Sequence, residues 1–217
     1  MSAPRHHPPA ELIVDLARGA VTPGRALVVR AHLGVCPACQ RALAVAEAVG
    51  GALLETLEPT LMAPDALARA LSKLEAELPQ ARPRAGPSRR PRPADWIAAP
   101  EAATDALARK RWAAPGVWTA PVRLAHRAPG HSYLLGIGPG ISVPLHTHRG
   151  VESLCVLKGS LEDGETLGPG DFRESDEAVV HRPRVTRDGE CVCLIWTERP
   201  LVPRSFIGWL MQPFVGI

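Results

Sequence analysis

The stretch from Gly140 to Gly159 constrains the fold most, because it sets two histidines and a glutamate among turn glycines and β-forming residues. It reads Gly-Ile-Ser-Val-Pro-Leu-His-Thr-His-Arg-Gly-Val-Glu and continues through Ser-Leu-Cys-Val-Leu-Lys to the second glycine. Alternate side chains share one face of an extended strand, so His146 and His148 are expected to point together. Glu152 has the same parity and reaches that side if the strand continues. Two imidazoles and a carboxylate, completed by one more histidine, are typical of a zinc or first-row transition-metal site.

Short β-like runs surround this stretch and predict an all-β unit. They span residues 117–124, 133–137, 151–157, 165–167 and 191–196, with Gly/Pro turns between them. Many short strands at this spacing indicate a β-sandwich or barrel. His181 follows the turn at residues 168–171 and is the natural fourth ligand. The expected ligand set is therefore His146, His148, Glu152 and His181, which suits Zn, Mn, Fe or Ni.

A second set of metal-binding residue types, His32-x3-Cys36-x2-Cys39, lies about a hundred residues upstream. Spacings of four and three residues around a helix start bring three side chains to one point, so they are expected to bind zinc. The tandem His6-His7 offers the fourth ligand of a structural site. The alternatives are a redox dithiol, which requires a βαβ context that is absent here, and unrelated cysteines.

Four helices are predicted around these residues. They cover residues 10–18, 23–33 with Thr22 as N-cap, 37 to about 50, and 64–78, and glycines separate the first three. The last helix carries one apolar stripe, formed by Leu67, Leu71, Leu74 and Leu78. That stripe faces either a core or a partner, and its pattern alone leaves both open. Such a small, Ala-rich unit needs a staple, and zinc supplies it.

Charge and composition divide the chain into three parts: a helical unit at 1–78, a Pro/Arg-rich linker at 79–95 and a β unit at 96–217. Residues 1–80 hold seven Lys/Arg against eight Asp/Glu, residues 81–95 hold five against one, and the remainder holds thirteen of each. The surplus positive charge thus lies in the linker. Because a DNA-binding domain concentrates basic charge on its folded face, direct DNA binding is not expected.

Five cysteines in Cys-x-x-Cys and Cys-x-Cys spacings do not resemble an extracellular disulfide framework. The first residues lack the apolar core of a secretory signal, and no run of eighteen apolar residues exists. We therefore expect a cytoplasmic protein with no membrane span.

Cys191 and Cys193 alternate on one predicted strand and so face the same way. Two interpretations stay open: they pack as small apolar residues, or they form a redox-responsive pair close to the metal. A direct disulfide between them would be strained. Cys155 has the opposite parity to Glu152 and is expected to point away from the metal.

The C-terminal part resembles the cupin superfamily, whose fold is a double-stranded β-helix barrel. The first cupin motif, Gly-x5-His-x-His-x3-Glu-x6-Gly, is met in full between Gly140 and Gly159. The second motif is met less closely: the turn at residues 168–171 resembles it, but His181 comes later than usual and no Asn follows.

The N-terminal part is similar to zinc-binding anti-sigma domains, whose signature of an upstream His and His-x3-Cys-x2-Cys maps onto His7, His32, Cys36 and Cys39. The two parts in this order, with Cys191-Val-Cys193 and the ending Gln-Pro-Phe, resemble the ChrR family of anti-sigma factors.

The resemblance implies a non-enzymatic regulator. A four-helix zinc domain would clasp an extracytoplasmic-function (ECF) type sigma factor one to one, using the leucine stripe, and block its access to RNA polymerase. The cupin, with zinc favoured, would sense singlet oxygen or organic peroxide, after which sigma is released. One hypothesis is that oxidant displaces a cupin ligand and the linker transmits the change. The rivals are a dioxygenase-like or isomerase-like cupin metalloenzyme with a regulatory helical domain, and a DNA-binding regulator.

Overall fold

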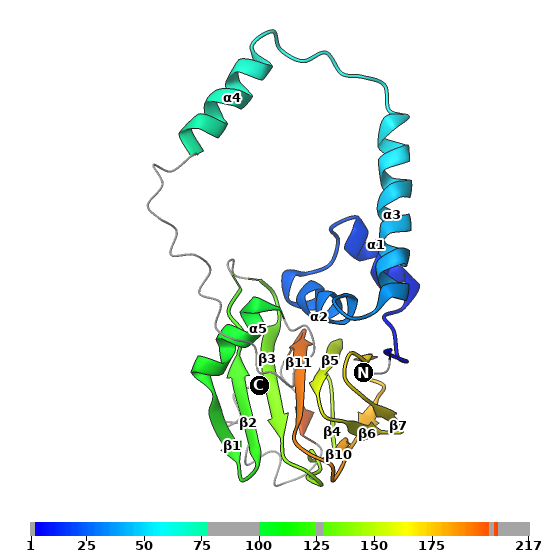
Figure 1. Ribbon diagram of the computed structural model, residues 1–217, viewed down its shortest axis with the longest axis vertical. Coiled ribbons are helices and arrows are strands. Elements are labelled where there is room, and N and C mark those ends of the chain that lie inside the picture. The colour runs from blue at the N-terminus through cyan, green and yellow to red at the C-terminus, as the bar shows by residue number, and fades with distance from the viewer. Residues whose placement is uncertain (1–2, 78–99, 125–127, 200–201, 204–217) are drawn as a thin grey trace.

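Helices form the first part of the chain and strands the second, in a computed structural model that describes residues 3–77, 100–124, 128–199 and 202–203 (Figure 1). The helices are α1 (Ala10–Ala17), α2 (Pro23–Leu33), α3 (Pro37–Glu55), α4 (Ala66–Glu77) and α5 (Glu101–Ala106), followed by the short 3-10 helix η1 (Leu107–Arg109). This order confirms the predicted α+β class. No helix in these ranges is long and apolar enough to cross a membrane.

The first two helices are short and bury an apolar face each. α1 buries Leu12, Ile13 and Leu16, a spacing that places all three on one side. α2 begins at Pro23, whose fixed φ suits a first helical position. Thr22 precedes it as predicted, but its side chain makes no capping hydrogen bond and its hydroxyl oxygen is buried without a partner in the described residues.

The third and fourth helices differ from their predicted bounds. The predicted break at Gly50-Gly51 is wrong, because α3 runs through both glycines to Glu55. Each glycine costs a helix about 1 kcal/mol relative to alanine, and the surrounding Ala, Val and Leu residues offset that cost. α4 begins two residues after the predicted Pro64. Leu78 lies outside the described residues. In Figure 1, α4 stands away from the other helices, so the predicted four-helix domain is a packed set of three with a separate fourth.

In the described residues of the second part of the chain, twelve strands follow α5 and η1. They are β1 (Arg111–Ala114), β2 (Val117–Pro121), β3 (His131–Ile137), β4 (His146–Thr147), β5 (Glu152–Lys158), β6 (Leu161–Asp163), β7 (Glu165–Leu167), β8 (Phe172–Ser175), β9 (Val180–His181), β10 (Arg184–Val185), β11 (Cys191–Thr197) and β12 (Val202–Pro203). All pairings are antiparallel, in a six-stranded sheet β1-β2-β3-β11-β5-β8 and two three-stranded sheets, β10-β6-β7 and β12-β4-β9.

The central strands β5 and β11 of the large sheet are buried on both faces, which explains why they read as continuous apolar runs. All seven residues of β11 are buried. Cys191, Cys193 and Ile195 join an inner cluster with residues of the smaller sheets, including Leu161 and Val185. Residues of the opposite parity, Val192, Leu194 and Trp196, join an outer cluster that also contains residues of α1 and α2.

The helices therefore share a core with the outer face of the sheet instead of forming a self-contained unit. Gly24 of α2 lies against the Trp196 ring, and a Cβ at this position would collide with the indole. Glycine is thus required for α2 to approach β11 closely. The unit boundaries at 78 and 95 remain predictions, since they fall outside the described residues.

Candidate metal centres

The first centre gathers four ligand atoms from the N-terminal segment and the α2–α3 turn. The ligand atoms of His7, His32, Cys36 and Cys39 all lie within 4.8 Å of one another. His32 Nε2 is 3.4 Å from His7 Nδ1 and 3.2 Å from Cys39 Sγ. His7 Nδ1 is 3.4 Å from Cys36 Sγ and 3.5 Å from Cys39 Sγ. His32 lies in the last turn of α2 and Cys36 directly precedes α3, so the turn between the helices sets their separation.

This donor set fits zinc. Tetrahedral coordination with Zn–N near 2.0–2.1 Å and Zn–S near 2.3 Å places ligand atoms about 3.3–3.8 Å apart, close to the separations observed. His32 Nδ1 donates a hydrogen bond to the Gly170 carbonyl at 2.6 Å, so Nε2 presents a lone pair to the centre. Burial raises the pKa of Cys39 to about 11. A bound cation supplies the charge that makes this thiol a thiolate.

The two N-terminal histidines diverge. His7 points into the cluster, whereas His6 lies 2.8 Å from Glu165 Oε2 and 3.1 Å from Asp171 Oδ2. Its backbone also contacts the β unit, because the Phe172 amide donates to the His6 carbonyl at 3.0 Å. His6 thus fastens the segment that carries His7.

The second centre gathers three imidazoles inside the β unit. The ligand nitrogens of His146, His148 and His181 lie within 4.8 Å of one another. His181 Nε2 is 2.9 Å from His146 Nε2 and 3.0 Å from His148 Nε2. The register explains this convergence, since His146 of β4 pairs directly with His181 of β9.

These nitrogens call for a cation between them. His146 Nδ1 donates to the Pro144 carbonyl at 2.8 Å, and His181 Nδ1 donates to Asp163 Oδ2 at 2.8 Å. Both Nε2 atoms then carry lone pairs, which repel at 2.9 Å unless a positive ion lies between them. Burial lowers the pKa of His148 to about 4, with the nearby His146 and His181 adding to the effect. His148 is therefore neutral at pH 7, as a metal ligand must be, and burial lowers the pKa of His146 in the same direction.

Glu152 lies in the same cavity but outside the cluster of close ligand atoms. The parity argument holds for Glu152 only if the strand continues from His146, and this condition is not met, because β4 ends at Thr147, the chain turns at Gly150 and Glu152 begins β5. Glu152 Oε2 lies 3.7 Å from His148 Nδ1, and burial raises its pKa to about 8. Its role as the fourth ligand remains a prediction.

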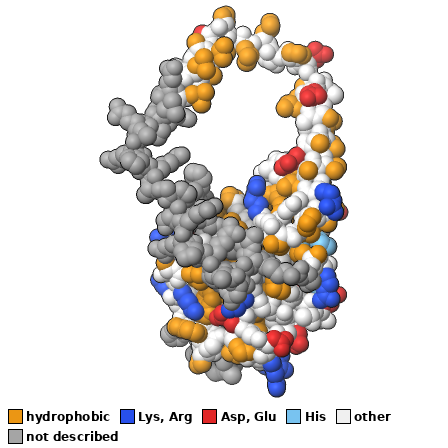
Figure 2. Space-filling model, in the orientation of Figure 1, with side chains coloured by type: hydrophobic (Ala, Val, Ile, Leu, Met, Phe, Trp, Pro, Cys, Tyr) orange, Lys and Arg blue, Asp and Glu red, His pale blue; other side chains and the backbone are white. Residues whose placement is uncertain are grey.

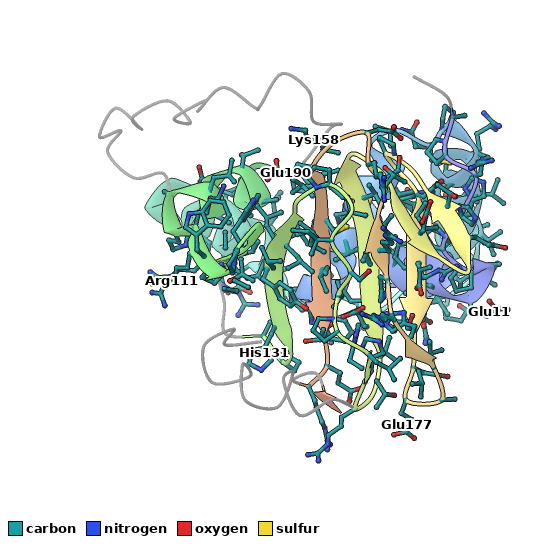
Figure 3. All side chains as sticks on the ribbon, turned by 90° about the horizontal axis from the view of Figure 1, so that it is seen from below. Glu11, Arg111, His131, Lys158, Glu177 and Glu190 are labelled. Atoms are coloured by element: carbon teal, nitrogen blue, oxygen red, sulfur yellow. The ribbon has the colours of Figure 1, made fainter. Side chains whose placement is uncertain are left out.

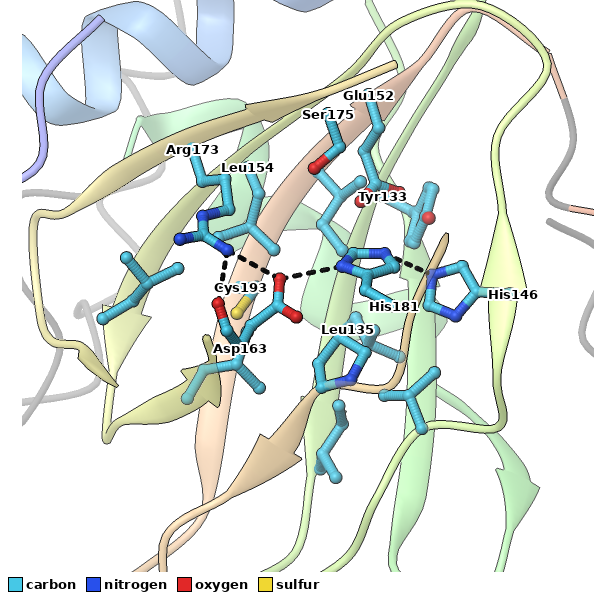
Figure 4. A pocket seen from close by; sticks show the side chains of 16 residues that line it. Tyr133, Leu135, His146, Glu152, Leu154, Asp163, Arg173, Ser175, His181 and Cys193 are labelled. Carbon is cyan, nitrogen blue, oxygen red and sulfur yellow. Dashed lines mark hydrogen bonds and ion pairs between the residues drawn. The ribbon is translucent and has the colours of Figure 1, made fainter. Parts of the chain in front are cut away.

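Two residues that the sequence did not mark organise this centre. Asp163 accepts the His181 hydrogen bond, and Arg173 Nη1 donates to the Asp163 carboxylate at 2.9 Å (Figure 4). Hydrogen bonds and ion pairs with His181 and Arg173 hold the pKa of Asp163 below its usual value, although burial opposes them. Asp163 precedes Gly164 between β6 and β7, and Asp-Gly is an ordinary hairpin-turn pair, so no sequence signal sets it apart.

We expect Asp163→Ala to weaken zinc binding by the histidine triad about 10- to 100-fold, because carboxylates that orient a histidine ligand contribute on that scale. Competition with a chelator in the full chain measures this. Glu162→Ala removes an exposed carboxylate one residue away and serves as the matched control. Equal affinities for the two variants would contradict the assignment.

The cavity beside the triad has a volume of about 40 Å³. Its wall combines apolar side chains with the charged residues of the centre, and Tyr133, Leu135, Leu154 and Ser175 are among those that face it (Figure 4). A water molecule requires about 10–15 Å³ by this measure, so the cavity has room for a few waters.

The cysteines of β11 lie next to this cavity. Cys193 lines it, and Cys191 Sγ is 3.7 Å from Cys193 Sγ with both buried. Cys155 points to the opposite face, where its Sγ lies 3.9 Å from the Gly170 carbonyl. The structure therefore agrees with the predicted directions of all three side chains. Whether the pair senses oxidant remains a proposal.

The described part of the leucine stripe on α4 faces solvent. Leu67 is 69%, Leu71 51% and Leu74 62% exposed. Of the two alternatives, core-facing or partner-facing, the exposure excludes a core within the described chain.

Known proteins with similar sequences or structures combine the same two parts. The family model for the ChrR cupin-like domain matches residues 101–199, and a zinc-finger family model matches residues 10–40. The anti-sigma-E factor ChrR of Cereibacter sphaeroides is 33% identical over 218 residues, which cover 98% of this chain and 99% of that protein. The crystal structure of Rhodobacter sphaeroides SigE in complex with the anti-sigma ChrR matches with a TM-score of 0.70 and 31% identity, covering 90% of this chain and 100% of the matched chain.

Proposed function

The chain belongs to the ChrR family of anti-sigma factors, and on that premise we propose that it binds an ECF-type sigma factor one to one and keeps it from core RNA polymerase. The near full-length relationship to ChrR, whose matched structure is a complex with SigE, carries this proposal. The protein acts in the cytoplasm, where RNA polymerase works, and does not bind promoter DNA itself.

An exposed apolar surface supports capture of a protein partner. Figure 2 shows hydrophobic side chains along the arch formed by α3, α4 and the segment between them. We call this surface the apolar arch; its exposed members are Val45, Val49, Leu53, Leu54, Leu57, Leu61, Met62, Leu67, Leu71 and Leu74. Contiguous exposed apolar surface is uncommon on a protein that functions alone, and it marks interaction sites. Sigma is proposed to cover this arch, and Leu78 is expected to extend it.

The zinc centre fixes the base from which the arch extends. His7, His32, Cys36 and Cys39 are the proposed zinc ligands. They join the N-terminal segment, the end of α2 and the start of α3 at one point, so zinc sets the direction in which α3 leaves.

The β unit is the proposed sensor. Singlet oxygen or organic peroxide alters its metal centre, held by His146, His148, His181 and Glu152, and sigma is then released. The metal is proposed to be zinc, which does not itself change oxidation state, so the oxidant acts on a ligand or on the adjacent Cys191 and Cys193. The small cavity favours this sensor over a cupin metalloenzyme, because a few waters' worth of space admits a small oxidant more readily than an organic substrate.

Leu71→Lys is expected to weaken sigma binding about 10- to 100-fold, because a buried leucine side chain contributes about 1.5–3 kcal/mol. The measurement is co-purification and titration of the full chain with an ECF-type sigma factor. Ser72→Lys adds the same charge at the adjacent, differently directed position of α4 and is expected to bind within about twofold of wild type. Absence of a 1:1 complex with wild-type protein would refute the function; equal binding by both variants would refute the role of α4.

A further inference from the structure

Strand β8 lies between the two candidate metal centres and presents one face to each. Phe172 belongs to the outer cluster with the helices, whereas Arg173 and Ser175 line the cavity of the histidine triad. Glu174 points outward again, toward α2. Alternation along an extended strand produces these two faces, so a displacement of β8 reaches both centres together.

The turn that precedes β8 hydrogen-bonds to the first centre on the side of the helices. The Gly170 carbonyl accepts the His32 Nδ1 hydrogen bond at 2.6 Å. The Asp171 carboxylate accepts backbone N–H groups of Arg5 at 2.6 Å and His6 at 3.0 Å, the two residues just before ligand His7. Two of the four proposed zinc ligands are therefore oriented by groups of the β unit.

The fit between this turn and the helices depends on a glycine. Gly170 has φ +91, a conformation that favours glycine, and a Cβ there would lie 2.7 Å from Pro4 Cγ and 2.9 Å from Val35 Cγ2. Four residues further on, Glu174 accepts three charge-assisted hydrogen bonds from Arg25 of α2, at 2.7 Å, 2.8 Å and 3.1 Å. The two contacts fix both ends of β8 against the helical region.

On the inner side, Arg173 ties β8 to the histidine triad. Its guanidinium donates to the carbonyl and the carboxylate of Asp163, at 2.6 Å and 2.9 Å. Asp163 in turn accepts from His181, whose Nε2 faces His146 (Figure 4). A continuous series of contacts thus runs from the triad through Arg173 and β8 to Gly170 and His32.

We propose that β8 transmits the state of the histidine centre to the zinc centre, with two positioning residues: Asp171 in the turn that precedes β8 and Arg173 on its inner face. This mechanism rests on the proposed function and deepens it, since it identifies how a change in the sensor loosens the clasp. It also replaces transmission through the linker by a direct contact between the two parts. Displacement of β8 withdraws the Gly170 carbonyl from His32 and the Asp171 carboxylate from the segment that carries His7.

Cobalt tests the proposal without a sigma factor. The full chain is loaded with Co²⁺, and the thiolate-to-cobalt absorption reports only the first centre, because the histidine centre has no cysteine among its ligands. Loss of that absorption after addition of EDTA gives the release rate. We expect Asp171→Ala and Arg173→Met each to raise this rate at least about fivefold, the lower end of typical couplings between sites. Arg184→Met replaces an exposed arginine of β10 and is expected to match wild type.

The double variant Asp171→Ala/Arg173→Met separates transmission from general destabilisation. If both residues act through β8, it releases cobalt no faster than the faster single variant, whereas independent effects multiply. Release from Arg173→Met within about twofold of wild type, or multiplied rates in the double variant, would overturn the proposal. Neither result bears on sigma capture, which is measured separately, so failure of the coupling and failure of the anti-sigma function are distinguishable.

Discussion

Replacement of Cys36 by alanine is expected to abolish sigma capture, with a loss of affinity of about 100-fold or more. Structural zinc in zinc-finger peptides contributes about 10–16 kcal/mol of folding free energy, and three remaining ligands cannot hold the ion as four do. Without zinc, no metal bonds link His7 of the N-terminal segment to Cys36 and Cys39 at the start of α3. The direction of α3, and with it the position of the apolar arch, is then no longer fixed. The triple replacement of His32, Cys36 and Cys39 is expected to give the same result.

Titration with sigma and elemental analysis of the purified chain measure this prediction together. Cys191→Ala is the matched control, because Cys191 is also fully buried, belongs to neither ligand cluster and lies in the inner cluster, away from the helices. It removes the same sulfur and is expected to retain sigma binding and one zinc in the first centre. Tight sigma binding by the zinc-free triple variant would show that the metal is dispensable and that the clasp is built differently.

The convergence of three of the four proposed ligands of the first centre could be predicted because they are close in sequence. His32, Cys36 and Cys39 span eight residues, so helix geometry brings them together whatever the rest of the chain does. The choice of His7 over His6 came from a family resemblance. The physical reason appears only in the structure, where Glu165 and Asp171 hold the His6 ring and leave His7 facing the cluster.

The second centre was predictable in its residues and not in its geometry. The two histidines and His181 do converge, and a cross-strand pair between β4 and β9 brings them together. The continuing strand on which the parity of Glu152 depended is not present between them and Glu152. Strand parity carries over only while the strand is unbroken, and Gly150 breaks it before Glu152. The sequence does not identify Asp163 and Arg173 as part of this centre, because the contacts of Arg173 with Asp163 and of Asp163 with His181 depend on the pairing of distant segments, which no local pattern encodes.

The contact between the two parts was also invisible in the sequence. A Pro/Arg-rich linker suggested independent units, but Arg25 and Glu174 are 149 residues apart and meet in a bidentate ion pair. Gly24 and Gly170, ordinary turn or helix-start glycines by their sequence, are the two points where only the absence of a side chain permits this approach. The contact between the helices and the β unit depends on the complementary shapes of surfaces that are distant in sequence. Composition and periodicity do not predict such complementarity.

His146→Ala is expected to leave sigma capture within about twofold of wild type and to slow oxidant-induced release at least about tenfold. The variant removes one proposed ligand of the triad, so the oxidant can no longer act on that imidazole in a complete centre. The Arg173–Asp163 pair is untouched and continues to hold β8, so the zinc centre and the apolar arch stay in place. Sigma should therefore remain bound where wild-type protein lets it go.

The release rate of sigma from the preformed complex, exposed to singlet oxygen or to an organic hydroperoxide, measures this effect. His131→Ala is the matched control, since His131 is an exposed histidine at the start of β3 and lies at the rim of the sheet (Figure 3). It should release sigma at the wild-type rate, because His131 lies outside the triad and its imidazole is not expected to take part in the response to the oxidant. A wild-type response from His146→Ala would mean that the triad is not the sensor. Cys191 and Cys193 would then be the next residues to replace, since Cys193 lines the same cavity and Cys191 Sγ lies 3.7 Å from Cys193 Sγ.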